Sequence, residues 1–555
     1  IQSMGDKITS KKIAAEAGVS TVPGYMGIID GPDEAVRIAS EIGFPIMLKA
    51  SAGGGGKGMR IAWDEAEARE GFISAQNEAR SSFGDERVFV EKFVEQPRHI
   101  EIQVLADSHG NCIYLGEREC SIQRRHQKVV EEAPSPFLDE ATRKAMGEQA
   151  VALSKAVGYA SAGTVEFIVD KNRNFYFLEM NTRLQVEHPV TEEVTGLDLV
   201  EQMLRVAYGE KLSITQDDVK LTGWSVETRV YAEDPFRKFL PSIGRLTRYI
   251  PPFEEEGVRV DTGIYEGAEI SMFYDPMIAK LVTTGATREE AIARQRKALD
   301  AYYIRGISHN IPFLSALMAH PRFISGDMTT AFIAEEYPDG FQGAALSESL
   351  RDQMMAAAVF MNAVAVSRNS QMPGQVEKPI SPLERNWTVT AGDYEVKSRI
   401  MSDAKGATVA LGRQHLSVET AWTPGQPLLR GTIGGEAVIF QVEPIALGYR
   451  VAAEGVSLDV LVQTPKAAEL LKLMPEKAEL DTSKYLLCPM PGLVVSVAVS
   501  EGDIVEAGQQ LAVVEAMKME NILKAEKTAK IAKVRVAAGD SLAVDAVMIE
   551  FESVG

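Results

Sequence analysis

Two glutamates in one predicted hairpin have the spacing that most clearly predicts chemistry. Strand-like patterns cover residues 163–170 and 175–181, and residues 171–174 would form the loop between them. With that loop, Glu166 falls directly opposite Glu179. Two facing carboxylates repel each other and are costly to bury unpaired. A bound Mg²⁺ or Mn²⁺, which prefers oxygen ligands, would remove this cost; the alternative is a glutamate solvated at a sheet edge.

The second strand of this hairpin is followed by alternating polar residues. If the strand continued to residue 187, one face would carry Glu179, Asn181, Arg183, Gln185 and Glu187. The aromatic run at residues 175–177 indicates that this region is buried. We therefore expect the floor of a site, in which Arg183 and Gln185 hold an anion and Glu187 accepts a proton. A solvated strand face is the simpler alternative.

Two further segments favour the binding of an anion. Lys49 ends a predicted strand, and a glycine run whose backbone N–H groups can surround phosphate oxygens follows it: Gly53, Gly54, Gly55 and Gly56. A flexible turn explains this run about as well. Residues 117–133 gather a basic cluster consisting of Arg118, Arg124, Arg125, His126 and Lys128. Such a cluster indicates either an anion site or a salt-bridged surface loop.

The elements that must position these residues form a mixed α and β body. Helical patterns cover residues 34–41 and 64–78, and strand patterns cover residues 44–50, 88–93 and 99–105. Residues 367–382 are rich in Ser, Asn, Gln, Pro and Gly, which is typical of a linker. Short alternating runs over residues 387–464 then predict an antiparallel β-domain.

The last part of the chain, residues 488–552, contains an internal repeat. Each copy is a strand, a Gly-Asp turn and a second strand, and the turns are Gly502-Asp503 and Gly539-Asp540. Two such copies must pack together to bury their apolar faces, so we expect a small quasi-twofold β-sandwich. Lys518 lies between the copies, and the spacing predicts that it stands at an exposed hairpin tip.

Composition limits the class of protein. The chain has 555 residues, which suggests three or four domains at about 150 residues each. Its formal net charge of −20 argues against a nucleic-acid partner. The three cysteines are too few and too scattered for a disulfide framework, which favours a reducing compartment. We expect no membrane-spanning segment and no export signal.

Four of these segments, in this order, resemble the biotin carboxylase member of the ATP-grasp superfamily: KASAGGGGKGM, EKFVEQPRHIEIQ, ERECSIQRRHQKVVEEAP and EMNTRLQVEHPVTE. CPMPG followed by EAMKME resembles a biotin carboxyl carrier domain. The combination is similar to the α subunits of biotin-dependent acyl-CoA carboxylases, and ISHNIPFLSALMAHPRFISGDMTTAFI favours the propionyl-CoA branch of that family. The family also implies an N-terminal subdomain before MGDK that this sequence lacks.

The resemblance implies a role for each matching residue. Its ATP site implies Lys7, Lys49, Gly53, Gly54, Gly55, Gly56, Glu91, His99, Gln123 and His126. Its metal ligands match Glu166 and Glu179, with Asn181 adjacent. Its bicarbonate and biotin site implies Lys128, Arg183, Gln185, the backbone of Val186, and Arg229, with Glu187 as the base. Lys518 matches the biotinylated lysine.

The resemblance also implies an architecture and an activity. We expect a multidomain α+β chain: a biotin carboxylase body at 1–335, a connecting helix and linker at 336–385, a β-rich subunit-docking domain at 386–470 and a carrier at 484–555. The implied reaction is ATP-dependent carboxylation of biotin by bicarbonate through carboxyphosphate, with Mg²⁺ or Mn²⁺. Biotinyl-Lys518 would then carry the carboxyl group to a partner carboxyltransferase subunit that converts propionyl-CoA to methylmalonyl-CoA.

The implied setting is a large hetero-oligomer, with Lys518 modified by a biotin protein ligase, in bacterial cytoplasm or, if eukaryotic, in the mitochondrial matrix; we favour the former. Three alternatives remain open. The chain could serve a methylcrotonyl- or acetyl-CoA carboxylase, act as a carrier and assembly module with an idle ATP site, or carry lipoate on Lys518 in place of biotin. The methionines on both sides of Lys518 favour biotin.

Overall fold

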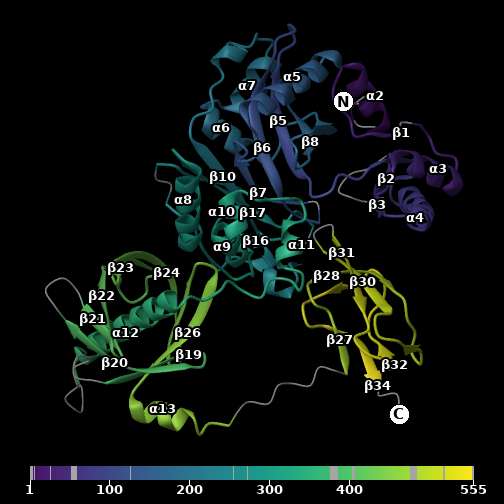
Figure 1. The fold of residues 1–555 in the computed structure, drawn as a ribbon. Coiled ribbons are helices and arrows are strands. Elements are labelled where there is room, and N and C mark those ends of the chain that lie inside the picture. Colours follow the sequence, from purple (N-terminus) through teal and green to yellow (C-terminus); the bar gives the residue numbers. More distant parts are fainter. Residues whose placement is uncertain are drawn as a thin grey trace.

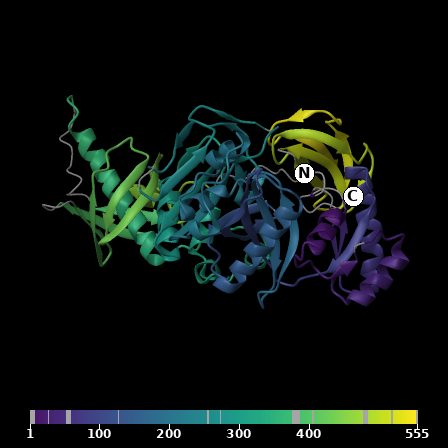
Figure 2. The ribbon, with the colours of Figure 1, turned by 90° about the horizontal axis from the view of Figure 1, so that it is seen from above.

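A computed structural model describes residues 4, 7–25, 27–51, 59–125, 127–253, 256–271, 273–374, 386–402, 407–475, 484–516 and 519–552. These residues form a carboxylase body, a β-barrel and a small C-terminal module (Figure 1). Figure 2 places the barrel at one end of the molecule and the C-terminal module toward the other, next to the N-terminal elements. No helix in the described ranges combines the length and apolarity needed to cross a lipid bilayer.

The N-terminal part of the body is a small sheet covered by helices. Among the described residues its strand order is β1-β4-β2-β3, and α3 and α4 pack on it. Asp64 caps α4 by accepting the backbone N–H of Glu67, and Gly84 ends the helix at φ 67°. The elements are α2 (Lys7–Glu16), β1 (Gly24–Tyr25), α3 (Pro32–Ile42), β2 (Ile46–Ala50), β3 (Met59–Ala62), α4 (Glu65–Phe83) and β4 (Val88–Lys92).

A larger antiparallel sheet forms the centre of the body. Within the described residues its order is β15-β17-β10-β7-β6-β5-β8-β9. The strands are β5 (Arg98–Ala106), β6 (Cys112–Arg124), β7 (Gln127–Ala133), β8 (Ser161–Val169), β9 (Phe175–Asn181), β10 (Trp224–Tyr231), β15 (Val258–Thr262) and β17 (Met277–Gly285).

The two faces of this sheet differ in chemistry because side chains alternate along each strand. One face is apolar: Ile100 and Ile102 of β5 belong to the cluster under α5 (Glu140–Ala156), and Val226 and Val230 of β10 belong to the cluster under α8 (Arg288–Ala301). The opposite face carries buried polar residues, including Glu101, Glu131 and Arg229, next to α6 (His188–Thr195). The sheet therefore presents a buried charged layer on one side.

The β-domain is a closed barrel. In the part of the chain that the structure describes, it consists of β19 (Trp387–Ala391), β20 (Tyr394–Ser402), β21 (Ala407–Leu411), β22 (Gln414–Thr420), β23 (Leu428–Ile433), β24 (Glu436–Ile445), β25 (Gly448–Ala453) and β26 (Val456–Gln463). The first strand pairs with the last, which closes the sheet. Helix α13 (Pro465–Leu471) follows.

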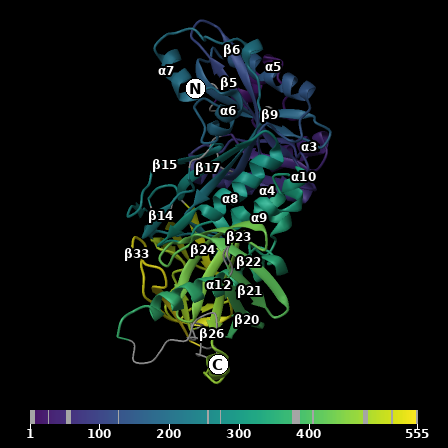
Figure 3. The same cartoon turned by 90° about the vertical axis from the view of Figure 1, so that its left-hand side faces the viewer.

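Helix α12 (Glu348–Ser370) fills the barrel and is not a separate connector (Figure 3). Met354, Met355 and Val359 are fully buried and share one apolar cluster with Val389 and Val460 of the barrel. The sequence assigns 336–385 to a connecting helix and linker because this Ala- and Met-rich helix has no polar face that would reveal its partner. In the structure, α12 belongs with the barrel.

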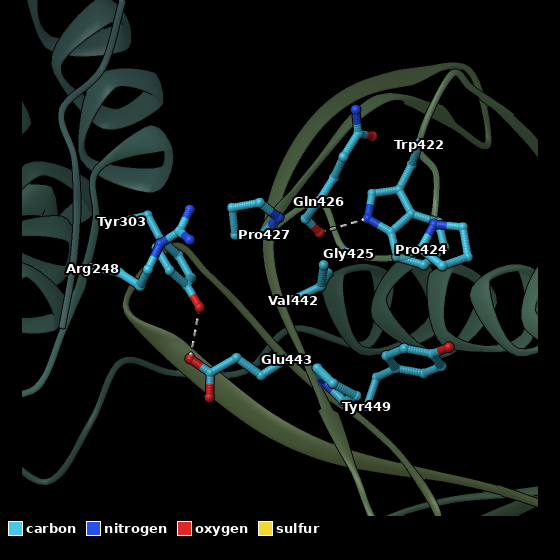
Figure 4. Close-up of a pocket in the computed structure, with 11 residues that line it drawn as sticks. Arg248, Tyr303, Trp422, Pro424, Gly425, Gln426, Pro427, Val442, Glu443 and Tyr449 are labelled. Carbon is cyan, nitrogen blue, oxygen red and sulfur yellow. Dashed lines mark hydrogen bonds between the residues drawn. The ribbon is translucent and has the colours of Figure 1, made fainter.

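Polar contacts join the barrel to the body. The Asp300 carboxylate at the end of α8 accepts the backbone N–H of Glu454 at 2.7 Å, and Arg296 pairs with the Glu454 carboxylate at 2.8 Å. Across the seam, the hydroxyl of Tyr303 points at the Glu443 carboxylate, 3.2 Å away (Figure 4). Beside this contact lies a pocket of about 300 Å³, which Trp422 and Tyr449 line from the barrel side.

The C-terminal module is a sandwich of two sheets, as the internal repeat predicts. Within the described residues the sheets have the orders β27-β34-β32-β29 and β31-β30-β28-β33. The strands are β27 (Tyr485–Leu487), β28 (Gly492–Val497), β29 (Ile504–Val505), β30 (Gln510–Ala516), β31 (Met519–Lys524), β32 (Ala529–Val534), β33 (Ser541–Leu542) and β34 (Val547–Glu552). Lys518 itself lies outside the described residues.

This module rests against the body. The guanidinium of Arg237 donates to the backbone carbonyl of Pro489 at 2.7 Å, and Leu240 packs against the module's apolar core. Pro489 belongs to the CPMPG motif. Arg237 ends the short 3-10 helix Pro235–Arg237, and Leu240 begins the short strand β12 (Leu240–Pro241), both after β10.

Candidate active site

The predicted hairpin is present, and Glu166 of β8 faces Glu179 of β9. The strands are joined by residues 170–174, one residue more than expected, and a bulge after Glu166 restores the expected pairing. Asn181 is opposite Thr164, and its side-chain amide donates to Glu166 at 2.9 Å. Carboxylate and amide oxygens are ligands of the kind that Mg²⁺ or Mn²⁺ prefers, but here the amide nitrogen of Asn181 faces Glu166.

The polar run beyond the hairpin is placed by a different element from the one expected. Strand β9 ends at Asn181, and Glu187 is the residue before the first turn of α6. Gln185 and Glu187 are nevertheless buried, and Gln185 donates to Glu166 at 2.9 Å. Arg183 is exposed, and its guanidinium donates to the neighbouring carbonyl of Leu184 at 3.3 Å. The expectation of one continuous strand face is therefore wrong.

Lys128 lies at the centre of the cluster. Its Nζ is 2.5 Å from Glu101 Oε2, 2.5 Å from Glu187 Oε1 and 3.3 Å from Glu166 Oε1. Burial would lower the pKa of this amine, but the surrounding carboxylates raise the pKa well above its usual value. Lys128 is therefore a firmly charged cation that holds together three acids from three different strands or turns.

Arg229 approaches the same cluster from β10. Its guanidinium is 2.6 Å from Glu131 Oε1 and 3.0 Å from Glu187 Oε2. Burial alone would raise the pKa of Glu187, but Lys128 and Arg229 outweigh it and hold the pKa well below the usual range. Glu187 is thus ionised and held between two cations, a position from which it can accept a proton only when those contacts are relaxed.

Residues implied for the ATP site fall into two groups. On the large sheet, Gln123 bonds to His99 Nδ1 at 2.9 Å, and His99 Nε2 is 3.0 Å from Glu166 Oε2. On the small sheet, Lys49 forms an ion pair with the buried Glu91. The side chain of Lys7, residues Gly53, Gly54, Gly55 and Gly56, and His126 lie outside the described part of the chain.

Sequence reasoning missed Glu101 and placed Arg118 only in a basic cluster, without its acidic partner. Glu101 bonds Lys128 as described, and Arg118 is fully buried with its Nε 2.6 Å from Glu101 Oε1. Arg118 also donates to Gln103 at 2.6 Å and Thr191 at 2.9 Å, so it serves as an internal brace and is not free for an anion. The alternation of His99, Glu101 and Gln103 along β5 was the available signal.

The basic cluster of residues 117–133 is largely neutralised by acids. Arg124 pairs with Glu233 at 2.7 Å, and Arg118 and Lys128 have the acidic partners described above. Arg118 and Arg124 are thus salt-bridged, but they lie on strand β6, with Arg118 fully buried, and not in the surface loop of the second interpretation. Lys128 differs because it contacts three buried carboxylates, those of Glu101, Glu166 and Glu187.

Fold and site together define a biotin-dependent carboxylase, and comparisons with known proteins agree. Family models match along the chain in this order: the carbamoyl-phosphate synthase L chain ATP-binding domain at 6–215, the biotin carboxylase C-terminal domain at 227–335, the propionyl-coenzyme A carboxylase BT domain at 354–477 and the biotin-requiring enzyme domain at 484–551. The last of these covers the module that carries Lys518.

Similar proteins narrow this class. The propionyl-CoA carboxylase alpha chain of Ruegeria pomeroyi is 62% identical over all of this chain and 84% of its own length. The mitochondrial alpha chain of Mus musculus is 51% identical over all of this chain and 77% of its own. The chain belongs to the family of propionyl-CoA carboxylase alpha chains. Its reaction is the ATP-dependent carboxylation of biotin, and the family implies a partner carboxyltransferase β chain.

A solved structure is also similar. The biotin carboxylase domain of 2-oxoglutarate carboxylase from Hydrogenobacter thermophilus, in complex with MgADP, ADP and bicarbonate, aligns with a TM-score of 0.59 and 49% identity. The alignment covers 61% of this chain and 74% of that one. The likeness is thus to the body of the chain, where the cluster around Lys128 lies.

Proposed function

We propose that the cluster around Lys128 is the place where bicarbonate is activated for the carboxylation of biotin. The observation that carries this proposal is the position of Glu187 between Lys128 and Arg229, 2.5 Å and 3.0 Å away. These two cations and Gln185 can hold a small anion, while Glu187 is the adjacent acceptor for its proton. We assign Arg183 and the backbone of Val186 to the same anion site.

The chemistry follows from this arrangement. When bicarbonate takes over contacts with Lys128 and Arg229, Glu187 loses stabilisation of its charge and becomes a better base. Glu187 then takes the proton of bicarbonate. An oxygen of the deprotonated bicarbonate attacks the γ-phosphorus of ATP, which releases ADP and forms carboxyphosphate. Carboxyphosphate releases CO₂ and phosphate. Biotin on Lys518 would supply the ureido nitrogen that takes up the CO₂, the released phosphate would accept the N–H proton of that nitrogen, and Arg229 would stabilise the negative charge that develops on the ureido group.

ATP would be held by Lys7, Lys49, Gly53, Gly54, Gly55, Gly56, Glu91, His99, Gln123 and His126. The ion pair between Lys49 and Glu91 supports the assignment of those two residues to one site. Glu166 and Glu179, with Asn181, would hold a divalent cation, which neutralises phosphate charge when it is bound. The opposed register of the two glutamates supports this choice of ligands.

We further propose the organisation of the whole chain. The carboxylase body spans 1–335, the barrel of residues 386–470 together with the α12 helix that fills it forms the domain that docks on the β chain, and 484–555 form the carrier. The chain would act in a large hetero-oligomer in bacterial cytoplasm, with Lys518 modified by a biotin protein ligase. The match of the BT domain to residues 354–477 supports the docking role.

The test measures ADP release by the purified chain with free biotin, with and without bicarbonate. We expect bicarbonate-dependent ADP release that Glu187→Gln reduces by about 100-fold or more. Glu148→Gln, on the exposed surface of α5, is the matched control. The proposal fails if ADP release does not depend on bicarbonate or if Glu187→Gln matches the control.

A further inference from the structure

Behind Arg229, two more carboxylates face each other on neighbouring strands. Glu131 of β7 is directly opposite Glu227 of β10, and both side chains are 0% exposed. Opposed like charges destabilise a sheet, and burying two ionised carboxylates is costlier still. The pair is therefore not expected to carry two negative charges.

Hydrogen-bond accounting leads to the same conclusion. Glu131 Oε1 accepts from Arg229 Nε at 2.6 Å. Within the described residues, Glu131 Oε2 and both carboxylate oxygens of Glu227 are buried without a hydrogen-bond partner. A proton on Glu227 would turn one of these oxygens into a donor for Glu131 Oε2, which satisfies two buried groups at once.

The surroundings favour one proton on the pair. Lys280 of β17 faces the same layer, but its Nζ is engaged by the Val186 carbonyl at 3.0 Å and by Asp261 at 3.0 Å. Glu187 adds negative charge, and Lys128 and Arg229 add positive charge. Helix α6 covers this layer with the apolar side chains of Val190 and Val194. The titratable side chains of α6 have other partners: His188 bonds the Gln185 carbonyl, and Glu192 and Glu193 lie 2.9 Å and 3.4 Å from the guanidinium of Arg259.

The pKa shifts of the two carboxyl groups agree with this geometry. Burial raises the pKa of Glu131 to about 7, against the opposing effect of Arg229. Burial and the facing Glu131 raise the pKa of Glu227 well above its usual value. Near neutral pH, Glu131 therefore ionises first, and Glu227 keeps its proton.

We propose that Glu131 and Glu227 share a single proton and act together as a positioning pair for Arg229. In this state the ionised Glu131 holds both Nε and Nη2 of the guanidinium at 2.6 Å, and Nη2 also reaches Glu187 at 3.0 Å. A second proton would remove the charged partner of Arg229. Loss of the last proton would place a second negative charge beside Arg229 and Lys280. The inference rests on the role proposed for Arg229 and Glu187.

This proposal predicts a bell-shaped dependence of kcat on pH, with each limb assigned to one residue. The acidic limb, near pH 7, reports ionisation of Glu131, and the alkaline limb reports ionisation of Glu227. Glu131→Gln should lower kcat by about 10- to 100-fold and abolish the acidic limb. Glu227→Gln, which keeps a neutral donor opposite Glu131, should retain the acidic limb and lose the alkaline one.

Glu132→Gln is the matched control. Glu132 follows Glu131 on β7, is buried, and pairs with Arg288 at 2.6 Å on the other face of the sheet. Its replacement removes a buried ion pair without touching the layer that contains Arg229, so both limbs should persist. Loss of a limb in this variant, or retention of both limbs in Glu131→Gln and Glu227→Gln, would overturn the proposal.

Infrared spectroscopy separates this inference from the proposed function because it requires no turnover. At pH 7.5 the wild-type chain should show the carbonyl stretch of a protonated carboxylic acid, and Glu227→Gln should remove that band. Absence of a band sensitive to Glu227→Gln refutes the shared proton even if the chain is active. If the band is present and ADP release does not depend on bicarbonate, the proton pair stands and the proposed function fails.

Discussion

The Nζ of Lys128 lies 2.5 Å from Oε1 of Glu187, so the proposed base is neutralised by the cation that would also bind its substrate. This contact suppresses the basicity of Glu187 until an anion competes for the lysine. In the proposed mechanism, proton transfer to Glu187 is therefore coupled to bicarbonate binding.

Replacing this lysine tests the coupling. Lys128→Met should lower bicarbonate-dependent ADP release by about 100-fold, because both the anion's partner and a buried countercharge are lost. The comparison variant is Lys144→Met, whose lysine is exposed on α5. A rate within threefold of wild type for Lys128→Met would contradict the assigned role.

Arg118 provides a prediction about stability. Replacing this fully buried guanidinium by methionine leaves Glu101 buried beside one fewer cation, and should lower the free energy of unfolding by about 3 to 5 kcal/mol. Arg205→Met removes an exposed ion pair with Glu201 on a helix surface and should lower the free energy of unfolding far less than Arg118→Met does. Urea unfolding of both variants measures the difference; equal losses would show that Arg118 is not a brace.

Asp300, at the contact between the body and the barrel, should make the stability of the fold depend on pH. Burial raises its pKa to about 7 from 3.8, despite the hydrogen bond from Glu454 N–H. The folded state therefore binds this proton more tightly than the unfolded state. Stability from this group is fully present below pH 3.8 and is lost as pH rises through about 7.

Asp300→Asn keeps the acceptor oxygen for Glu454 but removes the titration. The variant should melt about 3 °C or more above wild type at pH 8, and the gain should disappear toward pH 4. Thermal unfolding at several pH values measures this. A difference in melting temperature that does not change with pH would contradict the assignment to Asp300.

The hydrogen bond between Arg237 and Pro489 should help to dock the carrier on the body. Arg237→Ala removes a charged hydrogen bond and should slow carboxylation of the chain's own biotin by about 3- to 10-fold. The rate with free biotin, which does not require docking of the carrier, is the internal reference. An equal loss with free biotin would place the effect of Arg237 at the active site and not at the carrier contact.

The positions of residues that are close together in the sequence could be predicted from local patterns. Strand β9 has the expected bounds, and the register that opposes Glu166 to Glu179 follows from hairpin geometry. The sequence correctly grouped Glu187 with buried polar residues, but for the wrong reason. Glu187 is positioned by the turn before α6, and not by a continuation of strand β9.

Residues brought together by distant strand pairing could not be predicted in the same way. Glu131 meets Glu227 only because β7 and β10 are neighbours in the sheet, and nothing local in either strand specifies that order. The burial of Arg118 has the same origin. A basic residue in a polar run looks solvated until its partners, such as Glu101 on another strand, are known.

The closure of the barrel through β19 and β26 has an evolutionary consequence. The first and last strands of the barrel are hydrogen-bonded to each other, so all of its strands pair within the barrel. The barrel sheet therefore includes no strand from the body or the carrier. A unit closed in this way can be inserted into, or exchanged within, an ancestral gene while the catalytic sheet keeps its strand order. Replacement of the barrel by another domain would therefore leave every strand pair of the carboxylase body in place.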